Sequence, residues 1–150
     1  MSPDKALTAT IITSAATLSE LKEFLRANQL PADDISLKNS SFLLYRDVEN
    51  KISGSGGLEF YNKYALLRSL AVSPGLRGMM LGKKIVSELL SLARDKQLKE
   101  VYLLTNTASH FFEKFGFTEV TREEVPAEIK ATTEFASVCP SSAQVMRLVL

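Results

Sequence analysis

Two segments of this chain carry apolar residues at the spacing of one helix face. The longer is expected to run from Gly78 to Lys96, because apolar residues recur there about every 3.6 positions. Its apolar face consists of Leu81, Ile85, Val86, Leu89, Leu92 and Ala93. A second helix is expected to begin at Thr17, which forms a capping box with Glu20. Pro126 suits a first helical turn and favours a third helix over Pro126–Phe135.

Short runs of aliphatic and aromatic residues lie between these helices and predict strands. They are Ala9–Ile12, Ser41–Arg46, Ile52–Tyr61, Tyr64–Val72, Glu100–Thr105 and Gln144–Leu150. Asn62–Lys63 suits a tight hairpin turn. Tyr64–Val72, the long helix and Glu100–Thr105 form a βαβ unit, whose two strands should be parallel. The pattern therefore predicts one α/β domain over residues 1–150, with a mixed sheet of six or seven strands flanked by helices.

Composition argues against several classes of function. The chain has 18 basic and 17 acidic residues, so bulk binding to nucleic acid or to a membrane surface is not expected. No apolar run is long enough to cross a membrane, and the N-terminus does not resemble a secretory signal. The single cysteine, Cys139, cannot form an intramolecular disulfide, which is typical of a reducing compartment. These features favour a cytoplasmic protein.

The turn between Tyr64–Val72 and the long helix is the first candidate for a binding site. Ser73, Pro74 and Gly75 interrupt the strand, and Arg77 follows at the helix start. A helix start has unpaired N–H groups and the positive end of the helix dipole, which together bind anions, usually phosphate. Neither the dinucleotide fingerprint nor the P-loop motif is present. An ordinary strand–helix turn with a basic start is the alternative interpretation.

Two segments resemble signatures of the GNAT superfamily of N-acetyltransferases. The first, LAVSPGLRGMMLGKKIV, is similar to its acetyl-CoA-binding segment, with Arg77 and Gly82 at the first and last motif positions. Met80 replaces the middle glycine of that motif. The second, TASHFFEKFGF, matches the other family signature at Ala108, Phe111, Glu113, Lys114, Gly116 and Phe117. Gly116 is expected to end a short helix in a left-handed conformation.

The C-terminal segment narrows the resemblance. Together with GGLEFY and LLRSLAV, Glu123–Leu150 is similar to arsenic-resistance N-acetyltransferases, which are related to the catalytic domains of N-acetylglutamate synthases. The resemblance implies the acyl-CoA N-acyltransferase fold. It also implies transfer of acetyl from acetyl-CoA to the amino group of a small anionic amino acid or of an arsenic- or phosphorus-containing analogue.

The resemblance further implies where acetyl-CoA would bind, with no metal involved. Backbone groups of Leu70, Ala71 and Val72 would bind the pantetheine arm and polarise the thioester carbonyl. Asn106, at the end of a parallel strand, and Phe112 are further expected contacts. The N–H groups expected to hold the pyrophosphate belong to Arg77, Gly78, Met79, Met80, Leu81, Gly82 and Lys83. Met80 is expected to offer its N–H from a helical conformation.

Arg68 is the one cation in an otherwise apolar strand. Strand alternation places it on the face of Leu66 and Leu70, and a buried arginine is rare without an anion. The planar guanidinium suits a carboxylate or an arsenic or phosphorus oxyanion of the acceptor. A structural salt bridge, for example to Glu59, is the alternative interpretation.

Three further residues, Glu59, Tyr61 and Asn106, are candidates for contact with the acceptor, and Glu59 is also a candidate for catalysis. Glu59 shares a strand face with Tyr61 and could accept the amine's proton through water or bind its ammonium group. Asn106 is a candidate acceptor contact as well. Phe112 occupies the position where the resembled family usually has a tyrosine that protonates the leaving thiolate, so that donor is missing. His110 is expected on the surface, and Cys139 in a loop.

Two other functions remain open from the sequence. Met80 and Phe112 both depart from the family pattern, and they favour a protein that binds acyl-CoA without catalysis. An acetyltransferase acting on protein N-termini is the other alternative, and it would need an open peptide groove. The chain is expected to be a monomer or a homodimer, with a small amine acceptor as its partner.

Overall fold

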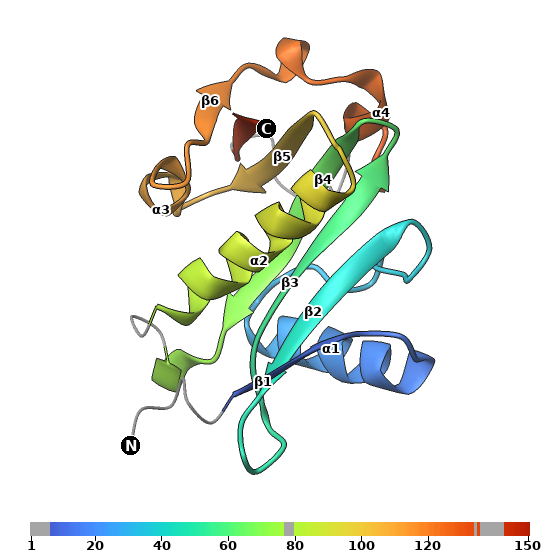
Figure 1. The fold of residues 1–150 in the computed structure, drawn as a ribbon, viewed down its shortest axis with the longest axis vertical. Helices are drawn as coiled ribbons and strands as arrows, with labels where there is room; N and C mark the ends of the chain where they lie inside the picture. The colour runs from blue at the N-terminus through green and yellow to red at the C-terminus, as the bar shows by residue number, and fades with distance from the viewer. Residues whose placement is uncertain (1–6, 77–79, 134, 136–142) are drawn as a thin grey trace.

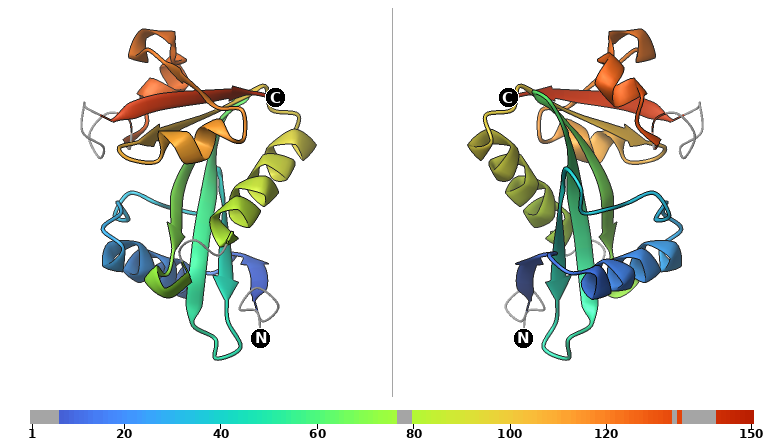
Figure 2. Two further views of the ribbon diagram at one scale, coloured as in Figure 1. Left: turned by 90° about the vertical axis from the view of Figure 1, so that its left-hand side faces the viewer. Right: turned by 90° about the vertical axis from the view of Figure 1, so that its right-hand side faces the viewer.

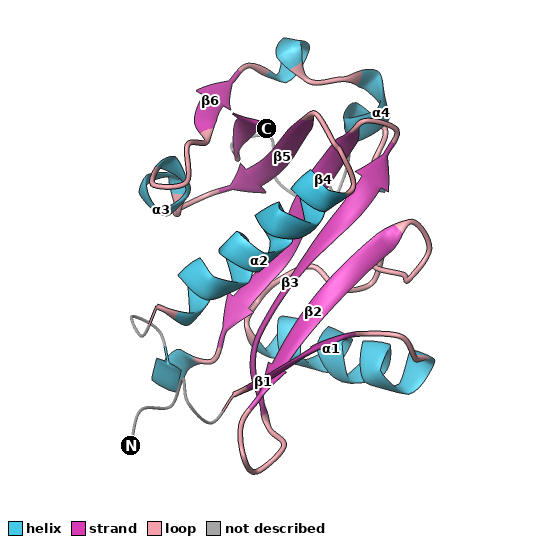
Figure 3. Cartoon of the chain, viewed as in Figure 1, coloured by secondary structure: helices cyan, strands magenta, loops and turns pink. Residues whose placement is uncertain are grey.

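The computed structural model describes residues 7–76, 80–133, 135 and 143–150, and its centre is a seven-stranded mixed sheet with the order β1-β2-β3-β4-β5-β7-β6 (Figure 1). Each strand and helix was expected within a few residues of its place, except β6 (Figure 3). The strands are β1 Thr8–Ile11, β2 Ser40–Arg46, β3 Ile52–Tyr61, β4 Tyr64–Val72, β5 Glu100–Thr105, β6 Thr118–Val120 and β7 Gln144–Val149. The helices are α1 Ala15–Ala27, α2 Leu81–Asp95, α3 Ser109–Glu113 and α4 Ala127–Lys130, with 3-10 turns at Pro74–Leu76 and Arg122–Glu124.

The pairing of the strands confirms the predicted topology. β1 to β4 form an antiparallel meander, and Tyr61 pairs with Tyr64 across the two-residue turn Asn62–Lys63. Asn62 adopts the left-handed conformation that such a turn requires, with φ 59°. β4 and β5 are parallel, as the βαβ unit predicts. β7 then inserts antiparallel between β5 and β6.

Helices cover both faces of the sheet, and α1 and α2 lie on opposite sides (Figure 2). On the α2 face, Ile85 and Leu89 pack against Leu58 and Leu67. On the α1 face, Leu21 and Leu25 pack against residues that include Phe42. A third apolar cluster joins α4 to the β4–β5–β7 part of the sheet. Within the described residues, no helix is long and apolar enough to span a bilayer.

The glycines of β3 allow close approach of neighbouring side chains. A Cβ on Gly56 would lie 2.6 Å from Ile85 of α2, and a Cβ on Gly57 would lie 2.3 Å from the Phe42 ring. Such distances are impossible without displacement of the neighbours. The missing side chains therefore let α2 and Phe42 pack directly on the β3 backbone.

Two helix boundaries differ from the prediction. α1 is capped by Ser14, whose side chain accepts a hydrogen bond from the Thr17 N–H, so the capping box expected at Thr17 is wrong. α4 ends at Lys130, and the helix predicted to reach Phe135 is interrupted at Ala131 and Thr132 before helical conformation returns at Thr133 and Phe135. The Thr132 hydroxyl donates to the Ile129 carbonyl and accepts from the Phe135 N–H, and such local side-chain bonds compete with helix continuation.

Candidate active site

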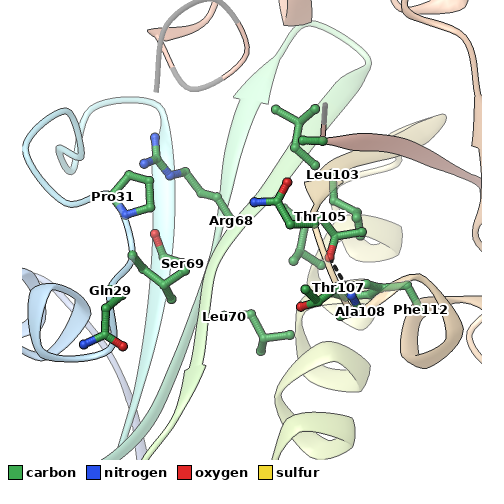
Figure 4. Close-up of a pocket in the computed structure, with 15 residues that line it drawn as sticks. Gln29, Pro31, Arg68, Ser69, Leu70, Leu103, Thr105, Thr107, Ala108 and Phe112 are labelled. Carbon is green, nitrogen blue, oxygen red and sulfur yellow. Dashed lines mark hydrogen bonds between the residues drawn. The ribbon is translucent and has the colours of Figure 1, made fainter. Parts of the chain in front are cut away.

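A cavity of about 410 Å³ opens where β4 and β5 part. The two parallel strands pair only from Tyr64 opposite Glu100 to Leu66 opposite Tyr102, and beyond this point they diverge. Residues 67–70 of β4 form one wall, and residues 103–108 form the wall opposite (Figure 4). Residues 29–31, which follow α1, contribute a third side. Beyond Leu66, the backbone groups of β4 thus face the cavity and do not pair with the backbone of β5.

A β-bulge reshapes β4 at this cavity. Ser55 pairs with Ala71 and Gly57 with Arg68, which leaves Ser69 and Leu70 together opposite Gly56. Ser69 adopts a left-handed conformation with φ 61°, and its carbonyl accepts a 2.8 Å hydrogen bond from the Ser55 hydroxyl. The extra residue reverses the alternation of side chains. Leu70 therefore packs with the α2 cluster, and the expectation that it shares a face with Arg68 is wrong.

Arg68 is buried and bonded to two carboxylates. Its Nη2 lies 2.8 Å from Asp34 Oδ1, and its Nη1 contacts both Asp34 Oδ2 and Glu59 Oε2, the latter at 3.2 Å. Burial would raise the pKa of Asp34, but the hydrogen bonds and charge of Arg68 outweigh it and hold that pKa below its ordinary value. The contact with Glu59 confirms the salt bridge that the alternative, structural interpretation of Arg68 predicted. Arg68 also lines the cavity, so its acceptor role stays a prediction.

Glu59 and Tyr61 belong to the Arg68 cluster and are not among the residues that line the cavity. The Tyr61 hydroxyl donates a 2.9 Å hydrogen bond to Glu59 Oε1, while Glu59 Oε2 accepts from Arg68. Burial, together with the neighbouring carboxylate, raises the pKa of Tyr61 well above its ordinary value. Both Glu59 oxygens thus have partners within the protein, and the proposed roles of Glu59 and Tyr61 toward an acceptor stay predictions.

The start of α2 differs from the expected geometry at Met80. Met80 is the N-cap and has a left-handed backbone, φ 64° and ψ 4°, so the expectation of a helical conformation is wrong. The left-handed region favours glycine, which is the residue that the resembled motif carries at this position. Leu81, Gly82 and Lys83 form the first turn, which contains no acidic residue. Their N–H groups are those that an α-helix leaves without intrahelical partners.

Met80→Gly is expected to raise the free energy of unfolding by about 0.5–1 kcal/mol. The glycine removes the strain of the left-handed backbone, and this gain exceeds the loss that comes from the greater chain entropy of the unfolded state. The side chain of Met80 is 66% exposed, so little buried area is lost. Urea denaturation would measure the change. Ser91→Gly, at an exposed position inside the same helix, should instead lower stability by about 0.5–1 kcal/mol. Equal effects in both variants would contradict the role given to the Met80 backbone.

The remaining predicted residues fall into two groups. Leu70, Asn106 and Phe112 line the cavity, and Phe112 is buried edge-to-face against Phe111 and Phe117. The others lie elsewhere. Ala71 packs in the α1 cluster, Val72 does not line the cavity, and His110 is exposed beside Glu113. Arg77, Gly78, Met79 and Cys139 lie outside the described residues, and their predicted roles stay predictions.

Sequence reasoning missed Asp34 and Ser69. Asp34 is far from Arg68 along the chain, and its only sequence signal was a pair of acidic residues after a proline in a loop. Ser69 gave no signal, since a single serine in a mainly apolar strand does not predict a bulge. Both residues matter to the cavity, because Asp34 holds Arg68 and Ser69 lies on the wall itself.

The family model described as "Acetyltransferase (GNAT) family" matches residues 11–117 of this chain. The chain belongs to the GNAT acetyltransferase family. This match spans the bulge, the start of α2 and every residue that lines the cavity except Ala143, and the seven-stranded sheet with flanking helices is the fold of this family. The resemblance drawn from the two motifs is therefore confirmed at the level of the superfamily, whereas the arsenic-resistance subgroup is not shown.

Individual relatives of this GNAT protein agree with the family match. A Mycobacterium tuberculosis "Amino-acid acetyltransferase" is 38% identical over 84 residues, which cover 55% of this chain and 48% of the relative. The chain thus spans about half the length of the curated relatives that it matches.

Two crystal structures are also similar to it. Rv2747 from Mycobacterium tuberculosis, in complex with CoA and NLQ, has a TM-score of 0.71 and 25% identity, over 94% of this chain and 99% of that one. N-acetylglutamate synthase from Neisseria gonorrhoeae, complexed with coenzyme A and L-arginine, has a TM-score of 0.76 and 14% identity, over 97% of this chain and 33% of that one. The second likeness concerns the fold alone.

Proposed function

We propose that this protein transfers the acetyl group of acetyl-CoA to the amino group of a small amino acid. The observation that carries the proposal is the cavity between the diverging ends of β4 and β5, in a chain of the GNAT family. Its volume of about 410 Å³ lies in the range of small-molecule sites. The similarity to an amino-acid acetyltransferase and to a structure that holds CoA supports the same conclusion.

Acetyl-CoA would lie across the end of β4 and the start of α2. The N–H groups of Leu81, Gly82 and Lys83 suit the pyrophosphate, since the first turn of α2 carries a positive partial charge and no acidic residue. The β4 backbone around Leu70 does not pair with β5. It is therefore suited to bind the pantetheine arm and to polarise the thioester carbonyl. Phe112 contributes an apolar wall and no proton donor.

Acetyl transfer requires a neutral amine beside the thioester carbon. The amine nitrogen forms a bond to the carbonyl carbon, the carbon–sulfur bond breaks, and CoA leaves as a thiolate. The nitrogen loses one proton, and water can receive it. Because Phe112 has no hydroxyl, the thiolate would be protonated by solvent, and the protein would contribute mainly position and polarisation.

An anionic acceptor is the finer form of the proposal, and it includes amino acids with an arsenic- or phosphorus-containing side chain. Its support is Arg68, a cationic residue among those that line the cavity, although its side chain is only 1% exposed. Asp34 and Glu59 already bind this guanidinium, so an acceptor carboxylate would have to share it with them. The preference of the site for an anionic acceptor should therefore be measured with a panel of acceptors.

Release of free thiol from acetyl-CoA should be measured with single amino acids, with arsenic- and phosphorus-containing analogues, and with a short peptide. We expect turnover with at least one small amino acid and little turnover with the peptide, because the cavity is compact. Binding of acetyl-CoA without turnover on any amine would contradict the proposal and favour an acyl-CoA sensor. Turnover confined to the peptide would favour a protein N-terminal acetyltransferase.

A further inference from the structure

One side of the cavity belongs to a loop and not to the sheet. Residues 29–31, which follow α1, contribute this side, while residues 67–70 of β4 form a wall (Figure 4). A loop has no strand ladder to hold its position, so the shape of the cavity depends on how this segment is attached to the rest of the protein. The structure shows one attachment on each side of residues 29–31.

The first attachment is the end of α1. The N–H of Gln29 donates to the Arg26 carbonyl at 3.1 Å. The N–H of Leu30 donates to the Leu25 carbonyl at 2.9 Å. These two hydrogen bonds form a Schellman motif, with Gln29 in the left-handed conformation at φ 58°. The motif fixes the loop to the helix and leaves its position relative to β4 to other contacts.

The second attachment is the turn from Ala32 to Ile35. The Ile35 N–H donates to the Ala32 carbonyl at 3.3 Å, and both residues are buried in the α1 cluster. Asp33 and Asp34 are the two central residues of this turn. They are adjacent in sequence, but their side chains pair with different arginines, one at the surface and one in β4.

Asp34 joins this turn to the β4 wall of the cavity. Both of its carboxylate oxygens accept from the Arg68 guanidinium, and this two-point contact fixes orientation as well as distance. The Arg68 side chain is 1% exposed and that of Asp34 is 14% exposed, so solvent screens the pair only weakly. Apolar packing, which also holds Ala32 and Ile35, is non-directional. The ion pair is therefore a directional contact between the loop and β4.

We infer that Asp34 is a positioning residue for acetyl transfer, an inference that rests on the proposed function. Its two-point pair with Arg68 holds residues 29–31 at a fixed distance from β4 and so sets the width of the acceptor cavity. Asp34 itself does not have to contact the acceptor, and no proton is transferred within the pair. A correctly placed wall limits the orientations of the acceptor beside the thioester carbon, which favours the reaction.

Asp34→Asn tests this role, because asparagine has nearly the shape of aspartate without its charge. Arg68 keeps Glu59 as a carboxylate partner, so the variant should still fold. We expect kcat/KM for the acceptor to fall about tenfold, mainly through a higher KM, while the acetyl-CoA Kd stays close to that of the original protein. Acidic and uncharged amino acids should be affected alike. A change confined to acidic acceptors would show that Asp34 acts through its charge, and would overturn the inference.

Asp33→Asn is the matched control. Asp33 lies in the same turn and pairs with Arg26 at 2.7 Å, but its side chain is 92% exposed and it does not line the cavity between β4 and β5. This variant removes the same charge from the neighbouring position and should leave acceptor kinetics unchanged. Equal losses in the two variants would overturn the inference, since the loss would then come from the net charge of the loop.

Amide hydrogen exchange measures the attachment of the loop without any substrate. The N–H groups of Leu30 and Ile35 are hydrogen-bonded, so their exchange requires local opening. Both should exchange faster in Asp34→Asn and at the original rate in Asp33→Asn. Unchanged exchange in Asp34→Asn, or faster exchange throughout the chain, would overturn a local role.

The two assays also separate this inference from the proposed function. If the original protein acetylates amino acids and Asp34→Asn has the same acceptor kinetics, only the inference fails. If the original protein acetylates no amino acid, the proposed function fails and takes the role in acetyl transfer with it. Hydrogen exchange would still show in that case whether Asp34 holds the loop.

Discussion

Arg68→Leu is expected to lower the free energy of unfolding by about 3–5 kcal/mol at pH 7, because it leaves two carboxylates buried without their cation. The side chain of Arg68 is 1% exposed, and those of Asp34 and Glu59 are 14% and 10% exposed. Chemical denaturation at several pH values would measure the loss. It should shrink toward pH 4–5, since carboxylates that have lost the guanidinium can bind protons there.

The free energy of unfolding of the original protein should itself fall in acid. The pKa of Asp34 is below its ordinary value in the folded state, so its contribution to stability is fully present above about pH 4. That contribution is lost as the pH falls further, through the folded-state pKa. Stability of the original protein should therefore decline in acid, over the range where the variant loses less.

Arg46→Leu is the control for the Arg68 variant. Arg46 pairs with Glu20 at 2.9 Å, but Glu20 is 49% exposed, and pairs at the surface contribute about 1 kcal/mol or less. The two arginines lie in strands of one sheet and differ in burial and in the number of carboxylates that they contact. A destabilisation by Arg68→Leu that is no larger than that by Arg46→Leu, and independent of pH, would show that the buried cluster contributes little to stability.

Gly82→Asp should raise the Kd for acetyl-CoA about a hundredfold, equivalent to about 2.7 kcal/mol, while the melting temperature stays unchanged or increases. The new carboxylate would repel the pyrophosphate and compete for the same N–H groups. It would also complement the positive end of α2, which has no acidic residue in its first turn. A Cβ at this position would meet Phe111 at 3.4 Å, an ordinary contact. Isothermal titration calorimetry and thermal unfolding would measure the two effects.

Gly82→Asn is the matched control, because asparagine has the shape of aspartate without its charge. We expect its acetyl-CoA affinity to remain within a few-fold of that of the original protein. Equal losses of affinity in the two variants would assign the effect to the bulk of the side chain. No loss in either variant would argue that the start of α2 does not bind the pyrophosphate.

Local pattern alone was enough to predict every strand except β6, the approximate positions of the helices, and the parallel pairing of β4 with β5. The apolar face of α2 repeats at helical spacing, and a strand, helix and strand in succession leave one common arrangement for the two strands. The two motif segments were likewise sufficient to recognise the family, since both are continuous in the chain. Periodicity and contiguous motifs depend only on residues close together in sequence, so they are readable before folding.

Tertiary structure decided the details of the site. The bulge at Ser69 and Leu70 depends on how β4 registers against β3, and no local pattern encodes that register. The pairing of Arg68 with Asp34 joins residues 34 positions apart, so it arises only when the loop after α1 reaches β4. Met80 has a left-handed backbone because the chain must turn from β4 into α2, against the preference of its side chain. In each case a long-range constraint outweighed the preference of the residue itself.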